Sequence, residues 1–133
     1  MEKKARILLV DDDVDFVEAT KTVLESKPYY EVIAAYEGDE ALRKAREEKP
    51  DLVLLDIIMP VKDGFTAAEQ FKKDPQLSKI PVVMLTSYSS RRAGTSIPVS
   101  RGLELEAEDY VEKPVSPENL FRIVEKYLKR TDS

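Results

Sequence analysis

The feature that most constrains this chain is a regular alternation of short apolar runs with segments of helical period. The runs at 7–10 and 52–55 are apolar at every position, as strands are when helices cover both faces of a sheet. The segments that follow such runs repeat their apolar residues every three or four positions, which indicates helices with one buried face. The alternation predicts an α/β fold, a doubly wound parallel sheet with helices on both faces.

Five strands and the helices between them can be placed from this pattern. We expect strands at 7–10, 32–35, 52–55, 80–85 and 110–112. We expect helices that include 16–24, 41–45, 65–71 and 117–128, separated by turns that contain proline or glycine. The last helix has the clearest start, because Ser116 can cap it and Pro117 suits its first position. The 133 residues fit a single domain over 1–133, with a core of about 5–129.

The residue types that are missing exclude several classes of chemistry. The chain has no Cys and no His, so it can form no disulfide, no imidazole-based triad and no zinc site of the usual ligands. The net charge of −5 argues against a nucleic-acid-binding surface, which normally carries a basic excess. No apolar run approaches the length of a membrane span or of a signal-peptide core, so we expect a cytoplasmic protein.

Charged and hydroxyl side chains follow four of the expected strands directly. The first strand is followed by Asp11, Asp12 and Asp13, the third by Asp56, the fourth by Thr86 and Ser87, and the fifth by Lys113. In a doubly wound sheet the functional crevice lies at the carboxyl ends of the strands, so we expect these groups to converge. Any one of them alone would be an ordinary turn or cap residue, whereas four such strand ends together indicate a site.

Carboxylates, a hydroxyl and an ammonium in one place fit magnesium-dependent phosphoryl transfer. Clustered carboxylates repel one another unless a cation neutralises them, and hard oxygen ligands suit Mg²⁺. A carboxylate can also act as a nucleophile and become an aspartyl phosphate. Lys113 and Mg²⁺ would neutralise the phosphoryl oxygens, and Thr86 would donate a hydrogen bond to one of them.

Four segments in this order resemble the receiver domains of bacterial two-component response regulators. They are residues 7–13 (ILLVDDD), 51–60 (DLVLLDIIMP) with the Asp-Gly pair at 63–64, 82–87 (VVMLTS) and 109–114 (DYVEKP). The resemblance covers nearly the whole chain and points to a single-domain regulator of the chemotaxis type. It implies a flavodoxin-like sheet of five parallel strands in the order 2-1-3-4-5.

The resemblance also implies which residues would carry the phosphoryl group and the metal ion. Asp56 would accept a phosphoryl group from a phosphohistidine on a sensor histidine kinase or a phosphotransfer protein. The ligands of Mg²⁺ would be Asp12, Asp56 and the backbone carbonyl of Ile58, with Asp11 acting mainly through water.

The remaining implied roles concern the switch and its read-out. Thr86 and Tyr110 would move when the domain is phosphorylated, and Lys113 would contact the phosphoryl group. The signal would pass to a downstream protein through the fourth helix, fifth strand and fifth helix. We expect no turnover of a separate substrate, and no direct nucleic-acid or membrane partner.

The segment 89–102 departs from the family pattern, because it is several residues longer than usual. Pro98 and two nearby glycines disfavour a continuous helix there. We expect a loop, followed by a short or displaced fourth helix around 100–107. The segment is either a tolerated surface insertion or a partner surface that carries three arginines.

Two other functions fit parts of the pattern. A phosphatase of the haloacid-dehalogenase type would use Asp11 as its nucleophile, because 8–14 and 82–86 match two motifs of that family. The acidic pair that such an enzyme needs after a further strand is missing beyond Lys113, and Asp56 is left unexplained. The other alternative is a receiver fold that binds its partner without switching, against which the complete set of strand-end residues argues.

Overall fold

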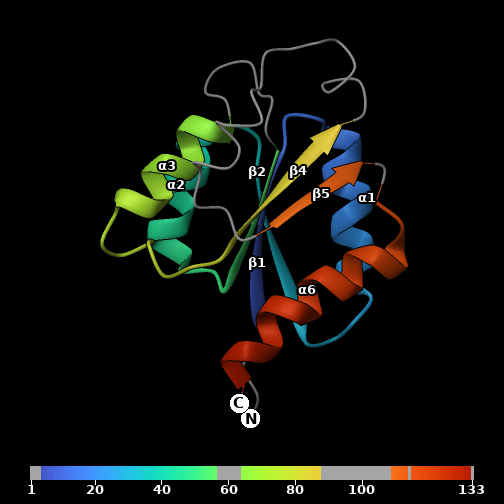
Figure 1. Ribbon diagram of the computed structural model, residues 1–133. Coiled ribbons are helices and arrows are strands. Elements are labelled where there is room, and N and C mark those ends of the chain that lie inside the picture. Colours follow the sequence, from blue (N-terminus) through green and yellow to red (C-terminus); the bar gives the residue numbers. More distant parts are fainter. Residues whose placement is uncertain (1–3, 57–63, 88–108, 114, 133) are drawn as a thin grey trace.

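The structure is a computed structural model that describes residues 4–56, 64–87, 109–113 and 115–132, with side chains within 4–56, 67–85, 111 and 115–128. Strands and helices alternate from β1 to β4 and again from β5 to α6, as predicted (Figure 1). The strands are β1 (Ala5–Val10), β2 (Tyr30–Ala35), β3 (Leu52–Asp56), β4 (Val82–Ser87) and β5 (Asp109–Lys113). The helices are α1 (Val14–Glu25), α2 (Gly38–Glu48), α3 (Gly64–Lys73) and α6 (Pro117–Asp132).

The strands form one parallel sheet in the order β2-β1-β3-β4-β5. This strand order is the one that the family resemblance implies, and the α/β flavodoxin-like fold class is confirmed. Most strands extend one or two residues beyond the expected ranges, whereas β4 begins later, at Val82 and not at residue 80. The reason is local: the Ile80 N–H donates to the Leu77 carbonyl (3.0 Å), and Pro81 has no N–H to offer the sheet.

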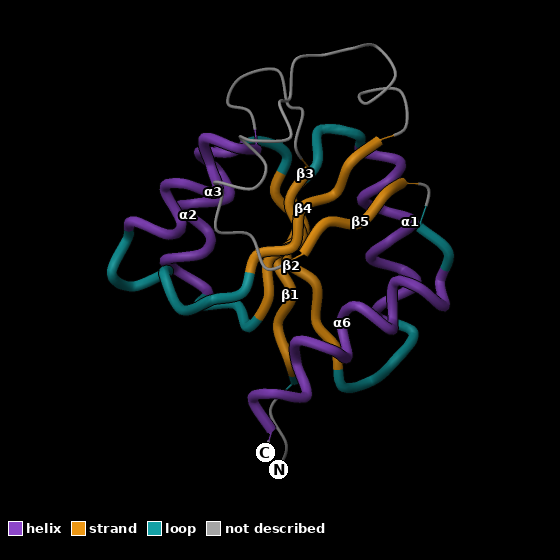
Figure 2. The backbone as a smooth tube through the Cα atoms, in the orientation of Figure 1, coloured by secondary structure: helices purple, strands orange, loops and turns teal. Residues whose placement is uncertain are grey.

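Each face of the sheet has its own hydrophobic core. Successive strand residues point to opposite faces, so Leu8 and Val10 of β1 pack with α2 and α3, whereas Ile7 and Leu9 pack with α1 and α6. Figure 2 shows α2 and α3 on one side of the strands and α1 and α6 on the other. Helices therefore cover both faces, which explains the unbroken apolar runs at 7–10 and 52–55.

Local sequence signals set the ends of the helices. Asp13 caps α1, its side chain accepting a hydrogen bond from the Phe16 N–H (3.1 Å). At the carboxyl end of α2, Lys49 adopts the left-handed conformation (φ 51°) in which many helices end. The predicted cap of the last helix is confirmed, because the Ser116 hydroxyl accepts from the Asn119 N–H (3.1 Å).

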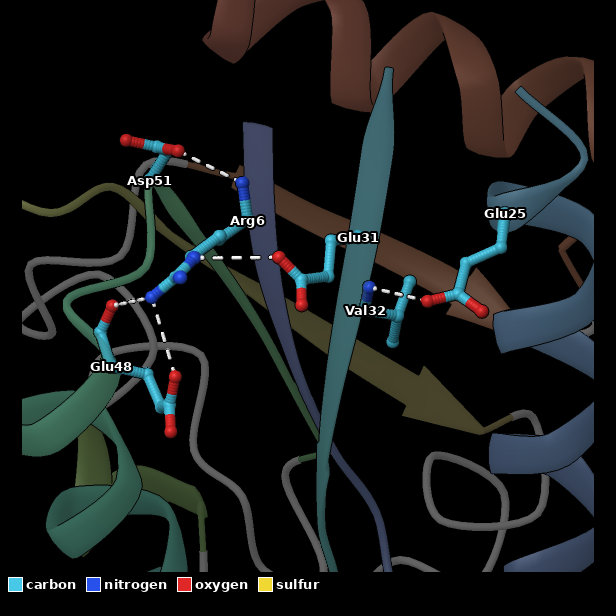
Figure 3. A network of polar contacts seen from close by, with 6 residues as sticks. All are labelled: Arg6, Glu25, Glu31, Val32, Glu48 and Asp51. Carbon is cyan, nitrogen blue, oxygen red and sulfur yellow. Dashed lines mark hydrogen bonds and ion pairs between the residues drawn. The ribbon is translucent and has the colours of Figure 1, made fainter. Parts of the chain in front are cut away.

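A polar network around Arg6 closes the amino edge of the sheet (Figure 3). The Arg6 guanidinium contacts Glu31 of β2 (3.4 Å) and both the carbonyl (2.8 Å) and the carboxylate (3.3 Å) of Glu48. The Arg6 backbone N–H donates to the Asp51 carboxylate (2.8 Å), just before β3. Because the charged side chains of the ion pairs are nearly half exposed, the network fixes geometry more than it adds ion-pair energy.

An ion pair joins α2 to the turn that follows α3. The Nε of Arg46 lies 2.9 Å from a carboxylate oxygen of Asp74, whose other oxygen accepts from the Gln76 N–H (2.8 Å). These bonds hold the turn that leads to the buried Leu77 and then to β4.

Two expectations fall on other parts of the chain. The long segment 89–102 and the displaced helix around 100–107 lie outside the described residues.

Among the helices that are described, none combines the length and the apolar composition that crossing a bilayer requires.

Truncating the core under α3 should destabilise the fold strongly. Phe71 is fully buried against the sheet, so Phe71→Ala should lower the free energy of unfolding by about 3–5 kcal/mol in urea titrations. Glu69→Ala on the exposed side of the same helix is the control and should change it little. Equal losses in the two variants would show that α3 does not pack as described.

The Arg46–Asp74 pair should make stability depend on pH. The hydrogen bond from the Arg46 guanidinium, and then that from the Gln76 N–H, lower the pKa of Asp74 below the usual 3.8. A lowered folded-state pKa stabilises the fold above the unfolded pKa, and this contribution disappears as the pH falls through the folded value. Wild type should therefore be more stable than Asp74→Asn near neutral pH, and the gap should close in acid. In an Arg46→Met background the gap near neutral pH should be smaller, and a gap of unchanged size there would contradict this account.

Candidate functional site

The carboxyl ends of β1 and β3 place two aspartates side by side. In the parallel pairing of β1 with β3, Val10 lies opposite Leu55. Asp11, the residue after β1, is therefore at the same level as Asp56, the last residue of β3. The Asp11 N–H donates to the Ala35 carbonyl (3.1 Å), which extends the ladder between β1 and β2 by one residue. The position of Asp11 is therefore fixed by the sheet rather than by a loop.

Three carboxylates meet at this edge. One carboxylate oxygen from each of Asp11, Asp12 and Asp56 lies within 4.8 Å of the other two. Asp11 and Asp56 are buried, with 1% and 6% of their surface exposed, while Asp12 is open to solvent. The cluster is thus anchored in the sheet and reachable from outside through Asp12.

Asp13, the third acid of the run, has a different task. Its backbone N–H donates to a carboxylate oxygen of Asp11 (2.9 Å), while its side chain caps α1. The sequence predicted Asp13 at the same strand end, but the carboxylates close enough to share a metal ion are those of Asp11, Asp12 and Asp56. The spacing between Asp13 and Phe16 was the available signal, since an aspartate commonly caps a helix through the N–H three residues later.

The donor set fits a hard divalent cation. It consists of carboxylate oxygens, and a chain without Cys or His offers no soft thiolate or imidazole ligand. Anionic oxygens so close together repel unless a positive charge lies among them. A small set of carboxylates, one of them open to water, suits Mg²⁺, which retains several of its waters when bound.

The backbone brings the other predicted strand ends to the same edge. Asp56 lies opposite Leu85 in the pairing of β3 with β4, so Thr86 is one residue beyond that level. Thr86 and Ser87 in turn pair with Glu112 and Lys113 at the end of β5.

Not every predicted site residue can be followed to its side chain. Thr86, Tyr110 and Lys113 are placed by their backbone in β4 and β5, and their side chains lie outside the described part of the structure. Ile58 lies outside it entirely. The structure therefore brings Asp11, Asp12 and Asp56 together and leaves the other contacts as predictions.

Comparisons with known proteins agree on one family. The family model described as response regulator receiver domain matches residues 7–125. The response regulator PleD of Caulobacter vibrioides is 43% identical over 120 residues, which are 88% of this chain and 24% of PleD. The Bacillus subtilis transcriptional regulatory protein PhoP, named for alkaline phosphatase synthesis, is 39% identical over 132 residues, 99% of this chain and 51% of PhoP.

A solved structure of similar length gives the same result. The CheY-like response regulator receiver domain protein of Methanospirillum hungatei superimposes with a TM-score of 0.83 at 31% identity, covering 98% of both chains. The chain spans between about a quarter and about half of the length of the curated relatives that it matches.

Relieving the repulsion in the cluster should stabilise the fold when no divalent cation is present. Asp12→Asn removes one of the three clustered charges, so its thermal unfolding midpoint should rise above that of wild type in a chelating buffer. Adding Mg²⁺ should raise the midpoint of wild type more than that of the variant, because binding to the folded state stabilises it.

Glu18→Gln is the matched control, since it removes the same charge from an exposed position on α1. It should respond to Mg²⁺ as wild type does. An equal response of all three proteins would mean that the three carboxylates do not form the cation site.

Proposed function

The chain belongs to the response regulator receiver family, and we propose that it acts as a phosphorylation-dependent switch in two-component signalling with Asp56 as the phosphoryl acceptor. The observation that carries this proposal is the meeting of buried Asp56 with Asp11 and Asp12 at the carboxyl edge of the sheet. A carboxylate that is to be phosphorylated needs neighbours able to hold a cation, and this arrangement supplies them.

The transfer step uses Asp56 as the nucleophile. One oxygen of its carboxylate attacks the phosphorus of a phosphohistidine, and the phosphorus–nitrogen bond breaks as the oxygen–phosphorus bond forms. The histidine nitrogen leaves with the bonding electron pair and takes up a proton. Asp56 rather than Asp11 is given this role because it stands in the segment 51–60 that resembles the acceptor segment of the receiver family.

Mg²⁺ is the cofactor that the donor set supports. Asp12, Asp56 and the backbone carbonyl of Ile58 would bind it directly, and Asp11 would act mainly through water. When bound, the ion neutralises the negative charge that gathers around the phosphoryl oxygens. Asp12 is the solvent-exposed member of the cluster, so an ion held there would keep contact with water on that side.

The ends of β4 and β5 would complete the site. Lys113 would place its ammonium on a phosphoryl oxygen, and the Thr86 hydroxyl would donate a hydrogen bond to another. Since Thr86 pairs with Glu112 in the sheet, and Tyr110 lies two residues before Glu112, a movement at Thr86 would be felt along β5. Phosphorylation would then shift a pre-existing equilibrium between two arrangements of Thr86 and Tyr110.

The partners follow from this chemistry. The donor would be a sensor histidine kinase or a phosphotransfer protein in the cytoplasm, and residues 1–133 would act as one receiver domain. The downstream target would be a protein that reads the face containing β5 and the neighbouring helices. The chain would carry one phosphoryl group at a time rather than turn over a separate substrate.

A small-molecule phosphodonor tests the acceptor directly. With Mg²⁺ present, intact-protein mass spectrometry should show wild type gaining the mass of one phosphoryl group, and Asp56→Asn gaining none. Asp13→Asn is the control: it alters the same edge of the sheet but keeps the α1 cap, and it should be labelled like wild type. Labelling that survives in Asp56→Asn but is lost in Asp11→Asn would move the nucleophile to Asp11 and contradict the proposal.

A further inference from the structure

The outer edge of β2 is covered by side chains from two helices. β2 is an edge strand, with β1 on one side only. The carbonyls of Tyr29 and Ala35 accept from β1 residues or from Asp11 directly after it, so alternate residues of β2 face β1 and those between them face outward. The outward-facing positions are therefore Tyr30, Val32 and Ala34, followed by residue 36.

One half of this edge is covered from the end of α1. The Val32 N–H donates to the Glu25 carboxylate (2.9 Å), a contact that Figure 3 shows reaching across from the helix to the strand. Just before it, the Tyr30 N–H donates to the Lys27 carbonyl (3.2 Å) in the turn between α1 and β2. Both N–H groups thus have partners from the same molecule.

The other half is covered by a closed set of contacts from α2. Lys44 Nζ donates to the Ala34 carbonyl (2.6 Å) and lies 3.1 Å from the Glu40 carboxylate. The other carboxylate oxygen of Glu40 accepts from the Tyr36 N–H (2.8 Å). The Lys44 and Glu40 side chains are only 28% and 25% exposed, so both are better shielded from water than the Arg43–Glu47 pair on the same helix.

We propose that Glu25, Glu40 and Lys44 hold the outer edge of β2 closed to strand pairing with a second copy of this chain. Unpaired strand edges are templates for pairing, and natural proteins protect them with charged side chains. The β2 edge would suit a second copy of itself, because an antiparallel pair related by a two-fold axis can place Val32 of one copy opposite Ala34 of the other.

The backbone groups of β2 that would bond to a second copy already have hydrogen-bond partners on α1 and α2. The Val32 N–H and the Ala34 carbonyl would bond across the two-fold axis, yet they are bonded to Glu25 and Lys44. A second strand would have to displace a carboxylate and an ammonium from these positions and leave Glu40 without its cation. These contacts prevent dimerisation through β2, and they do so independently of the phosphorylation proposed above.

Opening the edge from either helix tests the proposal. Lys44→Met keeps the length of the side chain but removes the ammonium, and Glu25→Ala removes the carboxylate from the other half of the edge. Arg43→Met is the matched control, since it loses one cation from the neighbouring position of α2, where its guanidinium pairs with exposed Glu47 rather than with a backbone group of β2. All four proteins would be compared by sedimentation over a range of concentrations, with circular dichroism to verify folding.

Wild type and Arg43→Met should remain monomeric, whereas at least one opened variant should reach about twice the monomer mass as concentration rises. A peptide with the sequence of residues 30–36 should return that variant to the monomer by occupying the edge. If Lys44→Met and Glu25→Ala both fold and both stay monomeric, the proposal is overturned. It would be overturned equally if both failed to fold, since the contacts would then maintain the fold rather than close an edge.

Discussion

The parallel pairing of β1 with β3 is the constraint on which the rest of the structure depends. Because Val10 lies opposite Leu55, the two strands end at the same level, and Asp11 and Asp56 emerge next to each other. Residues 7–10 of β1 and 52–55 of β3 are all apolar and buried, so a change of register would move core side chains to the wrong face. The hydrophobic cores thus fix where the carboxylates lie.

Charged side chains are arranged differently at the amino ends and at the carboxyl ends of the strands. At the amino edge, Arg6 meets Glu31 and Glu48, so opposite charges neutralise one another and hold the strands. At the carboxyl edge, three carboxylates gather within 4.8 Å of one another, an arrangement that costs stability until a cation joins it. Such local conflict between stability and electrostatics is characteristic of functional sites. The contrast supports placing ion binding and phosphoryl transfer at the carboxyl edge.

Sequence alone predicted the described strands and helices well, because burial on both faces leaves an unbroken apolar run within each central strand. The order of the strands in the sheet came from the family resemblance. It also predicted the α6 cap, since Ser116 and Pro117 act locally. It was less accurate at Ile80, where a local turn uses the N–H of that residue, so that β4 starts later than predicted. The separate task of Asp13 and the cover of β2 by Glu25 and Lys44 were not predicted. The cover of β2 depends on which helix end lies beside which strand, and spacing does not encode that. The capping role of Asp13 is local and could have been inferred from its spacing to Phe16.

The central claim is that the ends of β1, β3, β4 and β5 form one phosphoryl-transfer pocket. A crystal structure of the protein with Mg²⁺ and a beryllium fluoride mimic of the phosphoryl group tests it most directly. The account predicts one ion on Asp12 and Asp56, the mimic on Asp56, and the Thr86 hydroxyl and Lys113 ammonium within hydrogen-bonding distance of the mimic. An ion bound elsewhere, or Thr86 and Lys113 directed away from Asp56, would contradict it.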